Sequence, residues 1–486
     1  MSGSVPTYHV ENFGCRATQA DGAGLERQFE SRGLARASAA QADLVILNTC
    51  TVTNSADHDA RAAIRRVQRQ NPLAKIIVTG CYAQRAPDEI AALPGVSAVI
   101  GNSHKNQLAE IVLDEVIPRS GGFVPVGILA LSGERLTTND QRPLFVSDIF
   151  AHTELLAAPV FESATAGHHG GRTRPNLKVQ DGCDNRCSFC VIPSVRGHSR
   201  SLPPAEIIRE VNTLVAAGYR ELVISGINLG RWGRDLEVSH QRSAISETLS
   251  PAVRRPTTDD PRLESLIRAI LSQTELEKLR ISSVEPMDWS RDLIELVASS
   301  PRIAKHAHVP LQSGSDAVLR RMHRKYRPWH YREKIEKIHA AMPSAAIGAD
   351  VMVGFPGETD AEFEATRRLI EDLPFTYLHV FTYSARPGTP AAAMRNQVPP
   401  QAARERNKVL RDLAAEKKRA FMQSFLGKSL PAITLNAHTD AEFTEALTDN
   451  YQKLFLHGRH DPNRWITAQI DAFKDGAFLG MAIQSS

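Results

Sequence analysis

The chain has 486 residues, of which 42% are hydrophobic, and a formal net charge of only +4 from 58 basic and 54 acidic residues. This length is typical of two to four domains, and the charge balance alone does not indicate a nucleic-acid binder. No stretch approaches the roughly 18 consecutive apolar residues of a membrane span, and no targeting signal marks the N-terminus. Six cysteines are too few for a disulfide scaffold, so they indicate metal ligands or reactive thiols in a reducing, cytoplasmic compartment.

The N-terminal part alternates short apolar runs with helical patterns, which predicts a small parallel α/β domain over residues 5–115. The runs are residues 7–14, 43–49 and 75–80. Each run is followed by a cysteine: Cys15, Cys50 and Cys81. Because carboxyl ends of parallel strands meet at one edge of a sheet, we expect the three thiols to converge. The alternative is that each is a buried strand-end cysteine, since a free thiol packs as a small hydrophobe.

Residues 116–172 have little periodicity and are interpreted as a linker with an irregular insertion. Residues 173–400 alternate strand and helix again, in six units that predict an open (β/α)6 partial barrel, because a closed barrel needs eight. The expected strands are 177–180, 221–226, 278–283, 306–311, 347–355 and 377–384. Residues 237–262 are expected to form an inserted surface loop. A basic helical connector (401–425) and a small C-terminal β domain (426–486) complete the predicted α/β architecture.

Three cysteines lie within eight positions, directly after the first strand of the predicted barrel. Cys183, Cys187 and Cys190 have the spacing C-x3-C-x2-C. A structural zinc site normally closes with four ligands, and His198 is the nearest candidate for the fourth. A 4Fe–4S cluster normally takes four thiolates, so three would leave one iron open for a small molecule.

This motif resembles that of the radical S-adenosylmethionine (SAM) enzymes. Over residues 7–425 the sequence also resembles the methylthiotransferases, in motifs such as FGC, NTCTVTNSAD, TGCYAQ, VPLQSGSDAVLRRM, DVMVGFPGET and YSARPGTPAA. NTCTVTN and GINLGRWGRDL are most similar to the subgroup that acts on N6-threonylcarbamoyladenosine in tRNA. The subgroups acting on isopentenyladenosine tRNA or on a ribosomal protein are the alternatives.

The resemblance implies the chemistry and the partners. SAM would bind the open iron of a cluster held by Cys183, Cys187 and Cys190 and yield a 5′-deoxyadenosyl radical. A second 4Fe–4S cluster, on the N-terminal cysteines, would carry sulfur to carbon 2 of the adenosine at position 37, in the tRNA anticodon loop. A reducing electron donor is implied, and the sulfur source stays open. No catalytic residue is expected beyond the cluster ligands, and the C-terminal β domain is expected to be TRAM-like, although its match is weak.

Six further residues are candidate SAM contacts, because the carboxyl ends of barrel strands gather active-site groups. They are Ser225, Gly226, Ser283, Glu285, Gln312 and Asp350. Glu285 and Asp350 could equally serve in a salt bridge or a loop cap.

RNA contact is predicted from basic residues interleaved with aromatic ones. In residues 320–332, Arg and Lys alternate with Tyr326, Trp329 and Tyr331, a mixture suited to phosphates and unpaired bases. Residues 61–69 and 404–420 add basic surface. The alternative for each is a solvated helix face, and a hypothesis of another class is a non-catalytic zinc protein that binds RNA.

Overall fold

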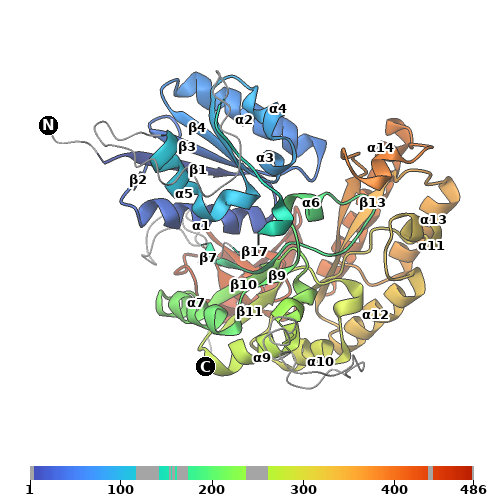
Figure 1. The fold of residues 1–486 in the computed structure, drawn as a ribbon. Coiled ribbons are helices and arrows are strands. Elements are labelled where there is room, and N and C mark those ends of the chain that lie inside the picture. The colour runs from blue at the N-terminus through green and yellow to red at the C-terminus, as the bar shows by residue number, and fades with distance from the viewer. Residues whose placement is uncertain are drawn as a thin grey trace, which may run out of the picture. The chain divides into compact units, whose positions relative to one another are not determined.

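The computed structural model describes residues 5–116, 142–152, 155, 159–160, 173–236, 261–435 and 442–483. It divides into two compact units (Figure 1). The first extends to Ala158 and includes a returning segment, Val191–His198, and the second comprises Pro159–Cys190 and Ser199 onward. The expected linker and the expected inserted loop lie largely outside the described residues.

The first unit is a parallel sheet with the strand order β2-β1-β3-β4-β5-β6. Because the order reverses between β1 and β3, a topological switch point lies at their carboxyl ends. The elements are β1 (Thr7–Asn12), α1 (Arg16–Glu30), β2 (Ala35–Arg36), β3 (Leu44–Thr49), α2 (Asn54–Gln70), β4 (Lys75–Gly80), α3 (Cys81–Arg85), α4 (Pro87–Ala91), β5 (Val96–Gly101), η1 (Asn102–Gln107), α5 (Leu108–Ile111), η2 (Val112–Val116), β6 (Leu144–Phe145), η3 (Ile149–Ala151) and α6 (Ile192–Arg196).

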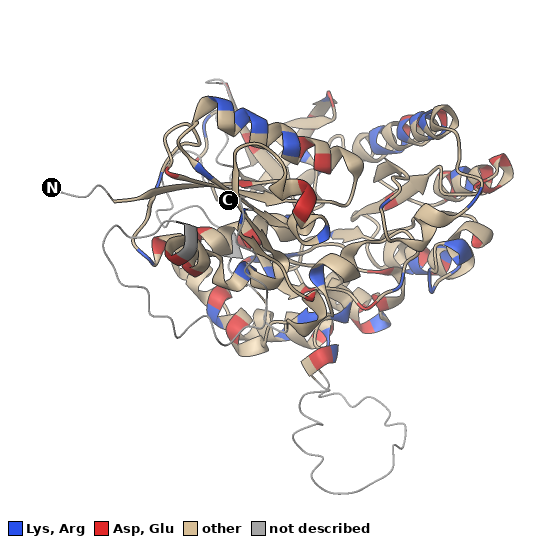
Figure 2. Cartoon of the chain, turned by 45° about the horizontal axis from the view of Figure 1, so that its top comes forward, with Lys and Arg blue, Asp and Glu red and all other residues tan. Residues whose placement is uncertain are grey.

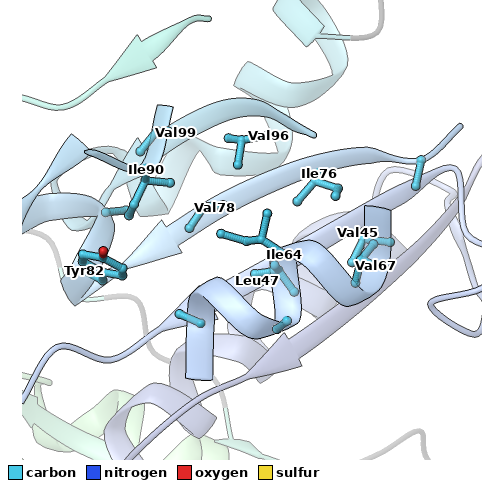
Figure 3. Close-up of a cluster of buried hydrophobic side chains, with 14 of the residues drawn as sticks. Val45, Leu47, Ile64, Val67, Ile76, Val78, Tyr82, Ile90, Val96 and Val99 are labelled. Atoms are coloured by element: carbon cyan, nitrogen blue, oxygen red, sulfur yellow. The ribbon is translucent and has the colours of Figure 1, made fainter. Parts of the chain in front are cut away.

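Helices cover both faces of this sheet. On one face Ile64 and Val67 of α2 belong to the same core as Val45, Leu47 and Val78 of the strands (Figure 3). On the other face, residues of α1 and α5 share a second core with the sheet. The central strands are therefore buried on both sides, which explains their nearly continuous apolar sequence.

The second unit contains the six predicted strand and helix units. Strands β8, β10 and β11 pair in parallel, and so do β12, β13 and β14. Isolated parallel bridges, including Ser283 with His308, join the two halves. The elements are β7 (Pro159–Val160), β8 (Asn176–Asp181), β9 (Arg200–Ser201), α7 (Pro204–Ala216), β10 (Glu221–Gly226), η4 (Leu229–Arg231), α9 (Leu263–Gln273), β11 (Lys278–Ile281), η5 (Pro286–Asp288), α10 (Arg291–Ser299), β12 (His306–His308), α11 (Asp316–Arg321), α12 (Pro328–Ala341), β13 (Ala346–Val353), α13 (Asp360–Asp372), β14 (Tyr377–Thr382) and η6 (Pro390–Ala393). The predicted open partial barrel is confirmed.

The chain ends in a long helix and a closed five-stranded barrel, so the expected small β domain is also confirmed. These elements are α14 (Pro400–Gln423), β15 (Ser429–Thr434), β16 (Phe443–Thr448), β17 (Lys453–His457), β18 (Trp465–Lys474) and β19 (Ala477–Ile483). The turn before β17, which contains Asp449 and Tyr451, packs on Arg280 of the partial barrel. The buried guanidinium of Arg280 lies 5.2 Å from the ring centre of Tyr451 and donates a hydrogen bond to the carbonyl of Asp449. Among the described helices, none has the length and apolarity needed to cross a membrane.

Candidate metal centres and active site

The three N-terminal cysteines follow neighbouring strands of the first sheet. Cys15 is the N-cap of α1 after β1, Cys50 follows β3, and Cys81 begins α3 after β4. Cys50 and Cys81 are buried, whereas Cys15 is exposed. Burial, together with the neighbouring thiols of Cys81 and Cys15, raises the pKa of Cys50 to about 12. The structure therefore brings together the three thiols that were expected at one sheet edge.

Glycines make this gathering sterically feasible. Gly14 has φ +109°, and a Cβ there would lie 2.5 Å from Cβ and 2.9 Å from Sγ of Cys50. Gly80 has φ +100°, and its Cβ would lie 2.3 Å from the carbonyl oxygen of Thr49. Only glycine fits both the backbone conformation and the close approach, so each glycine sets the position of the cysteine that follows it.

Buried charges surround the same edge. The carboxylate of Asp21 accepts hydrogen bonds from Lys105 Nζ at 3.1 Å and from Arg196 Nη2 at 2.9 Å. Two cations thus face one anion, and the charge of Arg196 opposes the rise in the pKa of Cys50. A positive charge near a thiol favours its thiolate form, which is the form that binds a metal centre.

The second cysteine set occupies the loop after β8, and its three thiols are half-buried. Three N–H groups point at its sulfurs: the backbone N–H of Asn185 and the side-chain amide of Asn228 donate to Cys183 Sγ at 3.4 and 3.6 Å, and Arg324 Nη1 donates to Cys187 Sγ at 3.3 Å. Hydrogen bonds of this kind are typical of thiolates that bind iron–sulfur clusters.

Gln180, the last residue of the predicted strand 177–180, stabilises this loop, although it was not among the predicted site residues. Its side-chain amide donates to the carbonyls of Asp181 and Gly182 at 2.9 and 2.8 Å. Its carbonyl oxygen accepts the backbone N–H of Asn228 at 2.7 Å. One buried amide therefore fixes both the residue before Cys183 and the asparagine that donates to that cysteine.

Glu285, a predicted SAM contact, forms an ion pair with Arg324. Burial raises the pKa of the Glu285 carboxyl, and the charge of Arg324 opposes that rise. Both residues line a small pocket of about 30 Å³ together with Cys187. Glu285 therefore forms a salt bridge beside the cysteine loop, and its contact with SAM stays a prediction.

The other predicted SAM contacts lie at or near the carboxyl ends of barrel strands. Ser225 and Gly226 end β10, with Ser225 buried. Ser283 Oγ is 2.7 Å from His308 Nδ1, and Asp350 Oδ1 is 3.3 Å from His308 Nε2. Gln312 has φ +63°, a conformation rare outside glycine, and its N–H donates to the carbonyl of Asp350 at 2.8 Å.

The spacing of the sulfurs bears on the choice between zinc and a cluster. Tetrahedral zinc holds sulfurs about 3.8 Å apart, given Zn–S bonds of about 2.3 Å. Among the described residues, which include all six cysteines, the only set of three His, Cys, Asp or Glu ligand atoms within 4.8 Å of one another is His308, Asp350 and His379. Both cysteine sets therefore lie outside the groups whose ligand atoms are all within 4.8 Å of one another.

The expected aromatic RNA surface at residues 320–332 is largely wrong. Tyr326 and Tyr331 are buried, with their hydroxyls donating to backbone carbonyls, because they pack beneath the loop that follows β12. Arg324 is buried as well, against Cys187. Trp329 is 56% exposed and is the one aromatic of the three that reaches solvent.

A basic groove lies along α14 instead, at the end of β14. Its volume is about 510 Å³, and its lining includes Thr382, Arg404, Lys408 and Arg411. Figure 2 shows basic residues recurring along this helix. Lys408 is paired with Asp412, so the arginines carry most of the groove's unbalanced charge.

Comparison with known proteins covers both units. Residues 177–370 match the radical SAM superfamily, and residues 7–101 match an uncharacterized protein family, UPF0004. The chain is 34% identical to the threonylcarbamoyladenosine tRNA methylthiotransferase MtaB of Bacillus subtilis, over 94% of this chain and 92% of that protein. The protein of the same name from Aquifex aeolicus is 33% identical, over 95% of this chain and 99% of that one.

Two further matches cover less of this chain. The tRNA-2-methylthio-N6-dimethylallyladenosine synthase of Corynebacterium glutamicum is 33% identical over 83% of this chain and 69% of that protein. Among solved structures, the radical SAM methyltransferase TsrM of Kitasatospora setae superposes with a TM-score of 0.54 at 15% identity, over 80% of this chain and 77% of that one. At that identity the likeness shows the fold alone.

Proposed function

Because the chain belongs to the radical SAM methylthiotransferase family, we propose that it adds a methylthio group to carbon 2 of N6-threonylcarbamoyladenosine at tRNA position 37, next to the anticodon. The observation that carries this proposal is the match of 94% of the chain to 92% of a relative named for that substrate. The chain is thus an enzyme, a sulfur-transferring transferase. We propose that it acts in the cytoplasm, where its tRNA substrate would be found.

Membership of the radical SAM superfamily implies one 4Fe–4S cluster and SAM. Cys183, Cys187 and Cys190 would hold that cluster, because they are half-buried in the loop after β8 and the sulfurs of Cys183 and Cys187 receive N–H hydrogen bonds. Three protein thiolates leave one iron for SAM. When bound, the pair supplies radical chemistry able to remove hydrogen from an aromatic carbon, which no side-chain acid or base achieves.

We infer that Cys15, Cys50 and Cys81 hold a second 4Fe–4S cluster, which would carry the sulfur for transfer. Support comes from the junction of three adjacent strands at a switch point, each followed by a cysteine, and from the positive charge of Arg196 acting on Cys50. The chain's own part is to hold these sulfurs in fixed positions, through Gly14 and Gly80, and to exclude water from Cys50 and Cys81.

The tRNA would contact the basic groove on α14. Arg404 and Arg411 present guanidinium groups suited to bidentate phosphate contact, and Trp329 offers an exposed ring for stacking on an unpaired base. These contacts position RNA without reading its sequence. The choice of adenosine would then depend on the inner face of the partial barrel.

A second candidate substrate is dimethylallyladenosine in tRNA. It is favoured by relatives named for that reaction, which match at 32–33% identity. Their coverage varies: 69% of the Corynebacterium glutamicum protein is matched, against 92% of the Bacillus subtilis protein named for threonylcarbamoyladenosine, while another dimethylallyl relative is matched over 86% of its length.

Mass spectrometry of tRNA nucleosides from a deletion strain tests the proposal. We expect 2-methylthio-N6-threonylcarbamoyladenosine to disappear in the deletion strain, with its unmethylthiolated precursor accumulating, and to return when the gene is restored. Loss of the dimethylallyl derivative would instead establish the second candidate. If all tRNA nucleosides stay unchanged, tRNA is not the substrate.

A further inference from the structure

Four polar side chains form a row across the inner face of the partial barrel. This polar row consists of Ser283, His308, Asp350 and His379. Ser283 is bridged to His308, and Asp350 is the register partner of His379 in the neighbouring strand. Along β13, Asp350 and Met352 are partly exposed and alternate with buried neighbours, so the row lies on the more accessible face.

One ring nitrogen of the row, His308 Nε2, has hydrogen-bonding capacity that no described residue uses. His308 Nδ1 is held at 2.7 Å by Ser283 Oγ, which fixes the orientation of the ring. His308 Nε2 is buried and makes no hydrogen bond, although Asp350 Oδ1 lies 3.3 Å away. A buried ring nitrogen without a hydrogen bond is costly unless a ligand or water completes it.

His379 contributes the exposed end of the row. Its ring meets that of His308 edge-on, with 5.5 Å between the ring centroids, and it also packs against Tyr377. The ligand atoms of His308, Asp350 and His379 lie within 4.8 Å of one another. A small polar group entering the barrel could therefore contact all three at once.

The row is adjacent to the cysteine loop of the same unit. The charge of Asp350 acts on Glu285, which pairs with Arg324, and Arg324 donates to Cys187. The carbonyl of Asp350 also accepts the N–H of Gln312, a predicted SAM contact. A group bound by the row would thus lie near the ion pair beside the proposed SAM-binding cluster.

We propose that the polar row binds the N6 substituent of the target adenosine and selects threonylcarbamoyl over dimethylallyl. This inference rests on the proposed function. The threonylcarbamoyl group carries urea N–H groups, a hydroxyl and carbonyl and carboxylate oxygens, which match the carboxylate and two imidazoles of the row. A dimethylallyl group has no polar atom, so its entry would exclude water from the row and leave His308 Nε2 without a hydrogen-bond partner, which is a strong basis for rejection by a binding site.

Binding measurements on the anaerobic, cluster-loaded enzyme test this selection. Anticodon stem-loop RNAs bearing N6-threonylcarbamoyladenosine, N6-dimethylallyladenosine or adenosine at the target position are titrated by fluorescence anisotropy. We expect the wild-type enzyme to bind the threonylcarbamoyl RNA about tenfold or more tightly than the dimethylallyl RNA. His379→Phe should remove most of that preference while leaving affinity for the adenosine RNA within about twofold, since phosphate contacts dominate it.

Matched variants keep the test decisive. His379→Gln retains hydrogen-bonding capacity and should retain much of the preference, and His339→Phe, on the outer helix α12, should retain all of it. Each variant is used only with wild-type iron and sulfide content. If His379→Phe and Asp350→Asn both keep the wild-type preference, the inference is overturned even if the enzyme modifies threonylcarbamoyladenosine in cells.

A divalent cation is the competing occupant, because two imidazoles and a carboxylate also suit such an ion. Preference that survives EDTA supports direct hydrogen bonding by the row. If EDTA abolishes the preference for threonylcarbamoyl RNA and cobalt restores it, with absorption bands of cobalt bound to nitrogen ligands, the row is a metal site. That result overturns direct hydrogen bonding by the row.

Discussion

At the scale of single residues, Arg324 lies in an environment that differs from the one its sequence context predicted. Its charge suggested RNA contact, but its guanidinium is buried between Glu285, Tyr326 and Cys187. A cation donating a hydrogen bond to a cluster thiolate stabilises the reduced, more negative state. Arg324 is therefore a positioning residue for the proposed SAM-binding cluster.

This role predicts a shift in reduction potential. In a background where Cys15, Cys50 and Cys81 are replaced by alanine, Arg324→Gln should lower the potential of the remaining cluster by on the order of 50 mV. Spectroscopic redox titration measures the shift. Asn102→Ala is the control, because Asn102 lies in the first unit, its partner Cys81 is already replaced in this background, and the potential of the remaining cluster should not change. If the potential of Arg324→Gln is unchanged, the only role of Arg324 is its structural ion pair with Glu285.

Gly14 supports a second prediction at this scale. Gly14→Ala would force a Cβ to within 2.5 Å of Cys50, in a backbone conformation that disfavours side chains. We expect the variant to lose about half of its bound iron and sulfide, because one of two clusters no longer assembles, while SAM-dependent spectral changes persist. Gly33→Ala is the control, since Gly33 has φ +82° but nothing within 4 Å of its Cβ position. Equal iron loss in both would attribute the effect to backbone strain alone.

At the scale of elements, apolar periodicity located most strands because parallel strands are buried on both faces. The run at 221–226 coincides with β10, and 75–80 with β4. The two-residue strands β2 and β6 were not predicted, because partner strands rather than local sequence define them. β5 also escaped, since a short apolar run after α4 does not by itself indicate a strand.

The sequence predicted those site residues that lie close together in the chain or directly follow an apolar run. Cys183, Cys187 and Cys190 are close in sequence, and the N-terminal cysteines each follow an apolar run. The hydrogen bond between Arg324 and Cys187 spans 137 residues, and that between Asn228 and Cys183 spans 45. Only the folded barrel reveals such partners, although GINLG did mark the segment that contains Asn228.

The helix α14 carries a prediction about RNA. Replacing Arg404 and Arg411 together by alanine should weaken tRNA binding and reduce the slope of log affinity against log salt by about 2, because each arginine is expected to neutralise roughly one phosphate. Arg368→Ala is the control, because this exposed arginine lies on α13 and pairs with Glu364. A salt slope equal to that of the wild type would exclude the groove as a phosphate site.

The packing of the C-terminal barrel gives another test at this scale. Tyr451→Ala should destabilise the second unit by about 1–3 kcal/mol, because the buried guanidinium of Arg280 would no longer have an aromatic ring beneath it. Urea unfolding measures the change. Tyr451→Phe keeps the ring and should lie near the wild type, so equal destabilisation by both would point to the hydroxyl instead.

At the scale of the whole molecule, two cysteine sets in one chain imply a division of labour. Replacing Cys183, Cys187 or Cys190 by alanine should abolish reductive SAM cleavage under anaerobic conditions. Replacing Cys15, Cys50 or Cys81 should stop sulfur insertion and leave some cleavage, because the first cluster remains. Product analysis by mass spectrometry separates the two activities, and equal loss of both in every variant would refute the division.

The returning segment Val191–His198 has a practical consequence for anyone dissecting this enzyme. Val191 and Val195 complete the apolar surroundings of Cys81, and Arg196 supplies one of the two cations on Asp21. A fragment ending at residue 158 would lack all three, so Cys81 would lose apolar neighbours and Asp21 would keep only Lys105 of its two cations. The first unit is thus built from two separate segments of the chain. Expressing only its first segment would give an incomplete domain for the proposed sulfur-carrying cluster.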